Sequence, residues 1–333
     1  MIRVLLTSLL LAASAFPAAA NTRDFLKKTD DWFRSAACRE RLANLLSHQD
    51  QAGCWPKNLD PTEKPYRGEQ KNLKGTFDNS ATVNELRLLA RAYQVTSNDH
   101  YKEAFQVGIT CILDAQYKNG GWPQSPIPSG YSQHITFNDG TMVGLMTFLR
   151  EVSEMDDSPL LPRKTRRQAR DAFDRGVQCI LACQIKVDGR LTAWCAQHDR
   201  KSLAPRGARA YEHPSLSGSE SAGVVCLLMS LEDPSKEIRR SIRAAANWFE
   251  QASITGIRLE KKNADYRILR DPKAPPLWAR FYEINTNRPI FSGRDGVIKY
   301  DVAEIEAERR NGYAWYGTAG KRVAASWAKW NWK

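Results

Sequence analysis

The sequence predicts an all-α protein, an α/α toroid in which helical hairpins form an incomplete barrel with long irregular loops on one face. Two observations carry this prediction. A helical hairpin pattern recurs along the chain, and the first two complete copies end near a glycine followed by a short stretch that contains tryptophan. One hairpin cannot bury its own apolar stripes, so successive hairpins must pack side by side.

The recurring unit is a pair of segments whose apolar residues follow the helical period. Three complete copies are expected, at residues 77–93 with 101–124, 137–152 with 169–194, and 216–231 with 238–261. An earlier, partial copy is "CRERLANLLSHQDQAGCWPKN" (38–58), whose "GCWPKN" resembles the "GGWPQS" at 120–125. Because each first helix follows a polar cluster, we expect these polar residues at helix N-termini on one rim of the ring.

The two ends of the chain differ from the repeats. The start, "MIRVLLTSLLLAASAFPAAA", has one arginine, an apolar run and a small-residue ending, as secretory signal peptides have. We therefore expect cleavage after Ala20, a periplasmic or secreted product, and a single domain over residues 21–333. No later stretch reaches the roughly 18 apolar residues that a membrane span needs.

The pattern changes after about residue 262 to a long segment with several prolines and glycines and few helical periods. Long irregular segments are usually functional. The terminal "NGYAWYGTAGKRVAASWAKWNWK" is expected to form one more helix, with aromatic residues that cover the ring.

Charge and cysteine content restrict the partners and the chemistry. The net charge of +12 would attract a polyanion, either nucleic acid or an acidic polysaccharide. Cys38 and Cys54 flank a helix end and are candidates for a disulfide in an exported protein. Four cysteines within apolar helical patterns are expected to be buried free thiols: Cys111, Cys179, Cys183 and Cys226. No cysteine spacing suggests zinc.

Acidic residues precede the first helix of each copy. Asp78 in "TFDNSAT" and Asp139 in "TFNDGTM" occupy nearly equivalent places, and Glu220 follows Ser217 and Ser219 in the third copy. Each is a candidate helix N-cap. The shared Thr-Phe context favours a common polar site, in which Asp78 and Asp139 could bind a hard cation such as Ca²⁺.

Arginines concentrate in two later segments. "QHDRKSLAPRGARAYEHPSLSGSES" contains Arg206 and Arg209 among aromatic residues, as surfaces that bind sugars often do. "NRPIFSGRDG" contains Arg288 and Arg294, with Arg280 and Tyr282 shortly before it. A solvated loop held by salt bridges is the alternative for each segment, although the planar guanidinium suits carboxylates in particular.

Other motifs are weaker or missing. Trp55 and Trp122, in the two Trp-Pro turns, are expected either to stack on sugars or to pack within the ring. Neither a G-x-S-x-G motif nor a phosphate-binding glycine-rich loop is present. The histidines follow no nucleophile pattern.

The segments "GGWPQ", "TFNDGTM", "PRGARAYEHPSLSGSES" and "WARFYEINTNRPIFSGRDG" together resemble the polysaccharide lyase family 10 pectate lyases. The resemblance covers roughly residues 35 to 320. It implies an α/α toroid that cleaves polygalacturonate by calcium-dependent β-elimination, with no nucleic acid or membrane partner. We expect a monomer.

The resemblance also implies roles for the candidate residues. Asp78 and Asp139 would lie at the calcium and uronate subsites. Arg209 would bind a substrate carboxylate, and Arg294 would be the base that removes the C5 proton. Further substrate-binding residues would be Arg206, Arg288, Tyr282 and Trp122. Which of Arg206 and Arg209, and which of Arg288 and Arg294, takes each role stays open.

Chemistry explains why such a site needs cations. Removing the C5 proton of a galacturonate leaves charge on the adjacent carboxylate, which calcium and arginine would stabilise. Cations close to a guanidinium also lower its pKa, which favours its neutral, basic form. Endo or exo cutting, preferred chain length and methyl-ester tolerance cannot be deduced from the sequence.

Two other functions remain open at this point. An α/α-toroid glycoside hydrolase would use paired carboxylates, such as Asp139 and Glu220, as general acid and base. A non-catalytic protein would use the arginines only to bind a polyuronate.

Overall fold

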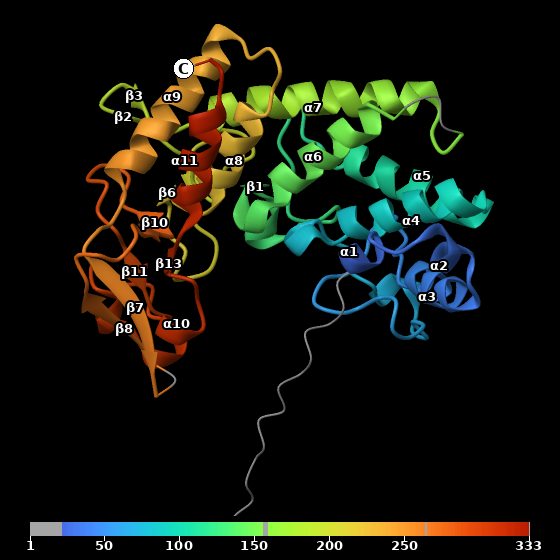
Figure 1. The fold of residues 1–333 in the computed structure, drawn as a ribbon, viewed down its shortest axis with the longest axis horizontal. Helices are drawn as coiled ribbons and strands as arrows, with labels where there is room; N and C mark the ends of the chain where they lie inside the picture. Colours follow the sequence, from blue (N-terminus) through green and yellow to red (C-terminus); the bar gives the residue numbers. More distant parts are fainter. Residues whose placement is uncertain (1–21, 156–158, 264, 333) are drawn as a thin grey trace, which may run out of the picture.

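The computed structural model describes residues 22–155, 159–263 and 265–332 (Figure 1). Its long helices form hairpins: α4 (Val83–Thr96) with α5 (Asp99–Asp114), α6 (Thr141–Ser153) with α7 (Arg163–Cys183), and α8 (Glu220–Met229) with α9 (Lys236–Gln251). Helix α6 contacts both α4 and α8, and α5 contacts α7. Successive hairpins therefore pack side by side, and the predicted incomplete α/α toroid is confirmed.

Short helices extend both ends of the series. The chain begins with α1 (Thr22–Phe25), α2 (Asp30–Arg34) and α3 (Ala36–Ser47), and both α1 and α2 pack on α4. The predicted terminal helix is α11 (Ala319–Lys329), which lies against α8 and α9 (Figure 1). The expected signal peptide, residues 1–20, lies outside the described residues.

The helices follow from apolar periodicity and local caps. In α4, Leu86, Leu89 and Tyr93 recur at helical spacing and are buried. Ser97 ends α4 in the left-handed conformation, with φ of 55°. The Asn98 side chain then accepts a hydrogen bond from the amide of His100 and starts α5. A change at a fully buried position such as Leu89→Ala would cost about 2–5 kcal/mol.

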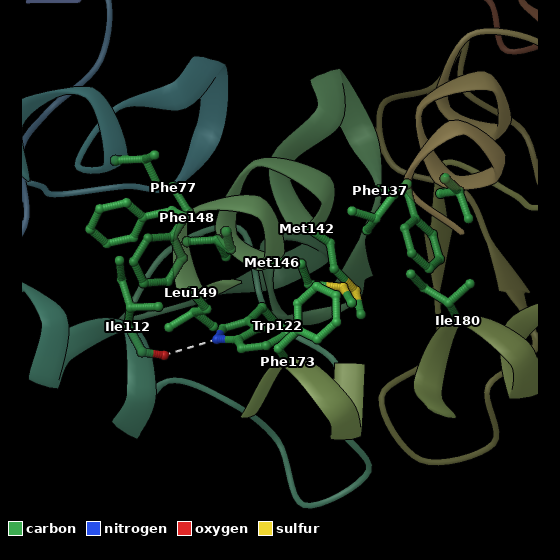
Figure 2. Close-up of a cluster of buried hydrophobic side chains, with 14 of the residues drawn as sticks. Phe77, Ile112, Trp122, Phe137, Met142, Met146, Phe148, Leu149, Phe173 and Ile180 are labelled. Carbon is green, nitrogen blue, oxygen red and sulfur yellow. Dashed lines mark hydrogen bonds between the residues drawn. The ribbon is translucent and has the colours of Figure 1, made fainter. Parts of the chain in front are cut away.

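Four buried tryptophans repeat one contact. Each indole N–H donates a 2.8 Å hydrogen bond to a carbonyl near the end of a preceding helix: Trp55 to Leu45, Trp122 to Ile112, Trp194 to Ile180, and Trp278 to Phe249. Figure 2 shows the second bond among Met146, Leu149 and Phe173. The sequence repeat of Trp-bearing turns is thus a structural repeat that closes each helical unit.

Main-chain bonds then join each unit to the next. A backbone amide shortly before each of α4, α6 and α8 donates to the carbonyl of the preceding repeat tryptophan: Thr76 to Trp55, Thr136 to Trp122, and Ser217 to Trp194. The following residue donates to the chain of the next repeat: Phe77 to Gln124, Phe137 to Ala196, and Gly218 to Arg280. These bonds fix the polar turns on one rim.

The C-terminal segment is less irregular than predicted. It contains the hairpin of β7 (Ile257–Lys262) and β8 (Asp265–Arg270), which lies at one end of the molecule (Figure 1), and the short helix α10 (Ala307–Asn311). The other strands have two residues each: β1 (Ile135–Thr136), β2 (Lys186–Val187), β3 (Arg190–Leu191), β4 (Gln197–His198), β5 (Pro205–Arg206), β6 (Leu216–Ser217), β9 (Trp278–Ala279), β10 (Phe281–Tyr282), β11 (Phe291–Ser292), β12 (Ile298–Lys299) and β13 (Tyr316–Gly317).

The short strands pair antiparallel, as β1–β4–β5, β10–β6, β11–β12, β13–β9 and β2–β3. A second apolar cluster, which includes Tyr211, Phe281, Phe291 and Trp315, lies beneath these loops, apart from the main core. The loops of this region are therefore held by their own small core. Among the described residues, no helix is long and apolar enough to cross a membrane.

The cysteine pairing differs from the expectation. The disulfide joins Cys54 to Cys111, so the suggested Cys38–Cys54 pair and a free Cys111 are both wrong. Helix α5 runs beside the first Trp-Pro turn, where Gly53 and Gly108 approach closely, and this brings the two sulfurs together. The predicted buried free thiols are confirmed at Cys179 and Cys183, while Cys226 is free but only half-buried.

Candidate active site

Two polar turns and the start of α8 meet on the rim from which α4, α6 and α8 begin. The 3-10 turns η2 (Asp78–Ser80) and η4 (Asn138–Gly140) contact each other, and η4 also contacts α8, which begins at Glu220. Asp78, Asp139 and Glu220 therefore lie on one rim, as their places in the repeat predicted.

The two aspartates are not in equivalent positions of their turns. Asn79 and Asp139 have φ of 54° and 49°, so these two residues correspond. Asp78 then corresponds to Asn138. Asparagine and aspartate tolerate the left-handed conformation better than most residues, which allows either to take that place. The carboxylates thus leave the same turn one residue apart and face different surroundings.

Asp78 is buried, with a side chain only 2% exposed. Its Oδ2 accepts hydrogen bonds from the ammonium group of Lys57 and from Nε2 of Gln124, the latter at 2.8 Å. Its Oδ1 is buried and has no hydrogen-bond partner among the described residues. An unsatisfied buried acceptor costs about 1–3 kcal/mol, so a ligand that reached it would be stabilised.

Asp139 and Glu220 share the guanidinium of Arg280. Nη2 of Arg280 lies 3.1 Å from Oδ1 of Asp139 and 2.8 Å from Oε1 of Glu220. Burial opposes the charge on Arg280, but the two carboxylates outweigh it and raise its pKa. Asp139 is 35% exposed and Glu220 only 1%, so Asp139 is the carboxylate of this cluster that a ligand can reach.

Tyr313 links this cluster to Arg209. The guanidinium of Arg280 lies 4.8 Å from the Tyr313 ring centre, and that of Arg209 lies 5.6 Å from it. The Tyr313 hydroxyl donates to Oε1 of Glu212 at 2.7 Å, and Nε of Arg209 donates to the other oxygen of Glu212 at 2.9 Å. The hydrogen bond to Glu212 raises the pKa of Arg209, against the opposing effect of burial.

Arg294 lies on the neighbouring loop and has a different partner. Its Nε and Nη2 each donate to Glu308 at 3.0 Å, and its side chain is 65% exposed. This pair raises the pKa of Arg294. A 3.1 Å contact between Nε2 of His213 and Oγ of Ser292 joins the Arg209 segment to the Arg294 segment. The loop that carries Arg294 therefore lies beside the segment that carries Arg209.

In the described part of the chain, Arg206 and Arg288, unlike Arg209, are not linked through Tyr313 to the acidic residues of the rim. Arg206, in strand β5, pairs with Asp199 at 3.2 Å. The guanidinium of Arg288 lies 3.6 Å from the ring centre of Tyr300, and among the described residues it has no carboxylate within ion-pair distance. No contact between described residues joins either arginine to Asp139 or Arg280. Arg288 nevertheless has a guanidinium free to bind an acid.

Trp122 and Tyr282 are buried, at 0% and 1% exposed. The Trp122 indole closes the second helical unit, and the Tyr282 hydroxyl donates to the carbonyl of Ala252 at 2.7 Å while it accepts from the amide of Ala279. Trp122 was expected either to stack on a sugar or to pack within the ring, and it packs within the ring. Neither side chain has surface for a sugar, so we omit both from the proposed site.

Three functional candidates share one position in the repeat; the sequence did not point to two of them, Lys57 and Gln124, and it placed Arg280 in the arginine cluster without a role. Lys57, Gln124 and Arg280 each stand two residues after a repeat tryptophan, and each contacts an acid of the rim. A polar residue two places after a repeat tryptophan is the sequence pattern that could have identified them. Tyr313 and Glu212 left no such signal, because their contacts join distant segments.

The acids can supply only part of a calcium site. Among the described residues, no three His, Cys, Asp or Glu side chains are placed to hold a metal ion. The buried, unpartnered Oδ1 of Asp78 and the exposed carboxylate of Asp139 are oxygen donors, which Ca²⁺ prefers. Since Ca²⁺ takes 6–8 oxygen ligands, the residues fit the ion only where other oxygens, such as substrate carboxylates, complete its shell.

Comparisons with known proteins concern the family and the fold. The sequence model described as "Pectic acid lyase" matches residues 25–324. The fold is similar to a family 10 polysaccharide lyase from Cellvibrio cellulosa, with 35% identity, a TM-score of 0.81, and coverage of 91% of this chain and 96% of that chain. An aspartate-to-alanine mutant of a family 10 polysaccharide lyase from Cellvibrio cellulosa, in complex with trigalacturonic acid, has the same identity and TM-score and covers 90% and 96%. No protein with a curated description is significantly similar in sequence.

Proposed function

This chain belongs to the pectic acid lyase family, and from this we propose that it is a pectate lyase that cleaves polygalacturonate by calcium-dependent β-elimination. The observation that carries the proposal is the match to pectic acid lyases over residues 25–324. The arrangement of acids on one rim facing arginines supports it. The substrate class follows from the family and from the trigalacturonic acid bound by the similar lyase.

In this proposal the acidic residues hold the cation. Asp139 and the unpartnered oxygen of Asp78 would bind Ca²⁺ together with carboxylates of the substrate. The ion, when bound, supplies positive charge beside the carboxylate on which charge develops during proton removal. Arg280 keeps Asp139 in place through their 3.1 Å contact and adds a second positive charge nearby.

Proton abstraction is assigned to an arginine. The sequence-based expectation placed the base at Arg294, but contacts favour Arg209. Each arginine pairs with a glutamate, but Arg209 is one aromatic ring away from Arg280 and the acids, whereas Arg294 is more exposed. We therefore give Arg209 the C5 proton and Arg294 the binding of a neighbouring uronate carboxylate, the reverse of the roles first expected.

The base must be neutral when it acts, although its carboxylate partner raises the pKa of Arg209. Cations beside the guanidinium have the opposite effect and favour the neutral form. Since the neutral fraction of an arginine rises about tenfold per pH unit below its pKa, turnover should rise steeply into alkaline pH. A maximum near pH 5 would instead indicate paired carboxylic acids.

The glycoside hydrolase alternative loses support in the structure. An acid–base pair needs two carboxyl groups that reach the substrate. Here Asp139 and Glu220 both accept from Arg280, and Glu220 is 1% exposed. A purely binding protein would need the arginines but has no need for acids on the opposite side.

One assay separates these functions. Polygalacturonate is incubated with the protein, and near-ultraviolet absorbance and reducing ends are followed with and without a chelator. We expect an absorbing unsaturated product whose formation stops with chelator. New reducing ends without absorbance would support the hydrolase, and binding without turnover would support the non-catalytic protein. The exposed Arg240→Lys change on α9 is a control that should leave the rate unchanged.

We also propose that the protein is exported to the periplasm or beyond, as its leader-like start suggests. Sequencing the N-terminus of protein recovered outside the cytoplasm would test this. A chain that retained residues 1–20 would contradict it.

A further inference from the structure

A buried arginine lies close to the proposed base. Arg309 is in the last turn of α10, and its side chain is 9% exposed. Its Nη2 donates to Oε1 of Glu308 at 3.0 Å and reaches the carbonyl of Gly312 at 3.5 Å. Its Nε is buried and has no hydrogen-bond partner among the described residues. A buried cation that is only partly compensated lowers stability, so its presence calls for a physical reason.

Two tyrosine rings place the guanidinium of Arg309 near that of Arg209. The Tyr211 ring centre lies 4.7 Å from Cζ of Arg309 and 5.0 Å from Cζ of Arg209. The Tyr313 ring centre lies 5.9 Å and 5.6 Å from the same two atoms. The two Cζ atoms are therefore no more than roughly 10 Å apart. Because Tyr211 is only 5% exposed, little water screens the two charges from each other.

The other groups around Arg209 favour its charged form or are themselves paired. Glu212 binds Arg209 directly and raises its pKa. Arg280 reaches it only through the Tyr313 ring and shares its own charge with two carboxylates of the acidic rim. In the described part of the chain, the charged or titratable groups in contact with Arg209 or with its two rings are Glu212, Tyr211, Tyr313, Arg280 and Arg309.

Glu308 leaves a surplus of positive charge beside Arg209. It accepts hydrogen bonds from both Arg294 and Arg309, each at 3.0 Å, so one carboxylate serves two guanidinium groups. Glu308 is also more than half exposed, and water screens its charge more than that of the buried Arg309. Arg309 therefore acts on Arg209 as a net positive charge.

We propose that Arg309 is a positioning residue for the reaction: it packs against Tyr211 and keeps positive charge beside Arg209, which favours the neutral guanidine that removes the C5 proton. A neighbouring cation disfavours the charged form of a guanidinium. The proton passes from C5 to Arg209, and Arg309 keeps its own. The inference rests on the proposed function, since it requires Arg209 to be the base.

The test separates the charge of Arg309 from its shape. Arg309→Lys keeps the charge and Arg309→Met removes it, while both lose the planar guanidinium. Arg240→Met, at an exposed position on α9, is the matched control. For each variant, kcat and KM for polygalacturonate are measured from pH 7 to pH 11, with Tm as the check on folding.

In Arg309→Met we expect kcat to fall about tenfold where it rises with pH, because a charge at roughly 10 Å changes the pKa of Arg209 by about one unit. Loss of a cation favours the protonated base, so the rise is displaced to higher pH, while KM stays within about twofold. Arg309→Lys should lose no more than about threefold in kcat, since it keeps the charge. Arg240→Met should match the parent protein.

Glu308→Gln is a change in the opposite direction. The side chain is more than half exposed, so the fold should tolerate the substitution. It removes the negative charge beside Arg309, so kcat at saturating substrate should increase about two- to threefold at the same pH. A purely structural role for Arg309 would not produce a gain.

Equal losses of kcat in Arg309→Lys and Arg309→Met would overturn the inference and show a role in packing only. If Arg309→Met does not fold, Glu308→Gln decides alone, and an unchanged or lower kcat overturns the inference. A parent protein without turnover would refute the proposed function and the inference together. A parent protein that turns over, with no difference between the two Arg309 variants, would refute the inference alone.

Discussion

The two sides of the site are built in different ways. The acidic side consists of the turns at residues 76–82 and 136–141 with Glu220, and the repeated main-chain bonds to the tryptophan segments place it. The arginine side consists of residues 206–217, 280–300 and 308–316, and it is placed by individual ion pairs and by aromatic contacts of Tyr313 with distant segments. Repetition fixes the acids through the backbone, whereas each arginine depends on its own partner.

This difference separates two kinds of failure. Damage to the repeat should lower the stability of the whole protein, because the repeat tryptophans lie in the main core. Damage to an arginine or an exposed acid should change the reaction and leave the fold intact. The following changes test that separation.

The largest effect is expected from Asp139→Asn. This change removes the accessible carboxylate of the acidic side, while Arg280 keeps its 2.8 Å contact with Glu220. We expect turnover to fall about 10²–10³-fold, as for loss of one key electrostatic group, with Tm within a few degrees of the parent protein.

A matched control exists for this change. Asp188 is exposed, has φ of 49° like Asp139, and lies in the turn between β2 and β3. Asp188→Asn should leave turnover unchanged. If Asp139→Asn unfolded the protein, or if both variants lost activity alike, the acidic side would not be separable from the fold.

Trp122→Ala, in contrast to Asp139→Asn, should mainly lower the stability of the fold. The indole is fully buried and closes the second helical unit, so its loss should cost about 3–5 kcal/mol of unfolding free energy. Urea denaturation followed by circular dichroism would measure this. Tyr300→Ala on the arginine side, where the ring is 40% exposed, should cost much less. A larger loss from Tyr300→Ala would contradict the comparison.

The disulfide lies within the helical repeat and does not involve the arginine side. It closes a loop between positions 57 residues apart, and replacing both Cys54 and Cys111 with Ala should cost about 2–4 kcal/mol. Cys226→Ala, at a half-buried free thiol, is the control and should cost less. Thermal melting with and without reductant measures the same effect on the unmodified protein. No change on reduction would show that the bond carries no stability.

Acid should weaken the arginine side. Burial would raise the pKa of Glu212, but its bonds to Arg209 and Tyr313 outweigh this and lower it. A lowered pKa adds stability above the unfolded value near 4.5 and loses it as pH falls through the folded value. Glu212→Gln should cost about 1–2 kcal/mol at pH 7, and the difference from the parent protein should shrink in acid. A constant difference from pH 7 to pH 3 would refute this.

The sequence was most informative where structure repeats. Helical hairpins, polar helix starts and Trp-bearing turns recur in the chain, so the toroid and the position of Asp78 and Asp139 could be predicted from local patterns. The one-residue shift between these aspartates needed the backbone angles. The Cys54–Cys111 pair could not be predicted, because it depends on how α5 packs beside the first turn.

The arginine side could be predicted only as a concentration of charge. The candidates Arg206, Arg209, Arg288 and Arg294 look alike in the sequence, and their partners Asp199, Glu212, Tyr300 and Glu308 lie nearby in the chain but at a different spacing in each pair. Pairs at irregular spacings leave no periodic signal, and the link through Tyr313, which joins Arg209 to Arg280, is a tertiary contact. For the same reason, the buried state of Tyr282 could not be predicted from its neighbours.

The pH dependence of turnover in Arg209→Lys and Arg294→Lys tests the central claim most directly, because lysine loses its proton at a lower pH than arginine. The account predicts that Arg209→Lys retains weak activity with its rise displaced to lower pH. Arg294→Lys should raise the KM for polygalacturonate and keep the parent profile. A displaced profile in Arg294→Lys, with a parent-like profile and rate in Arg209→Lys, would contradict the account.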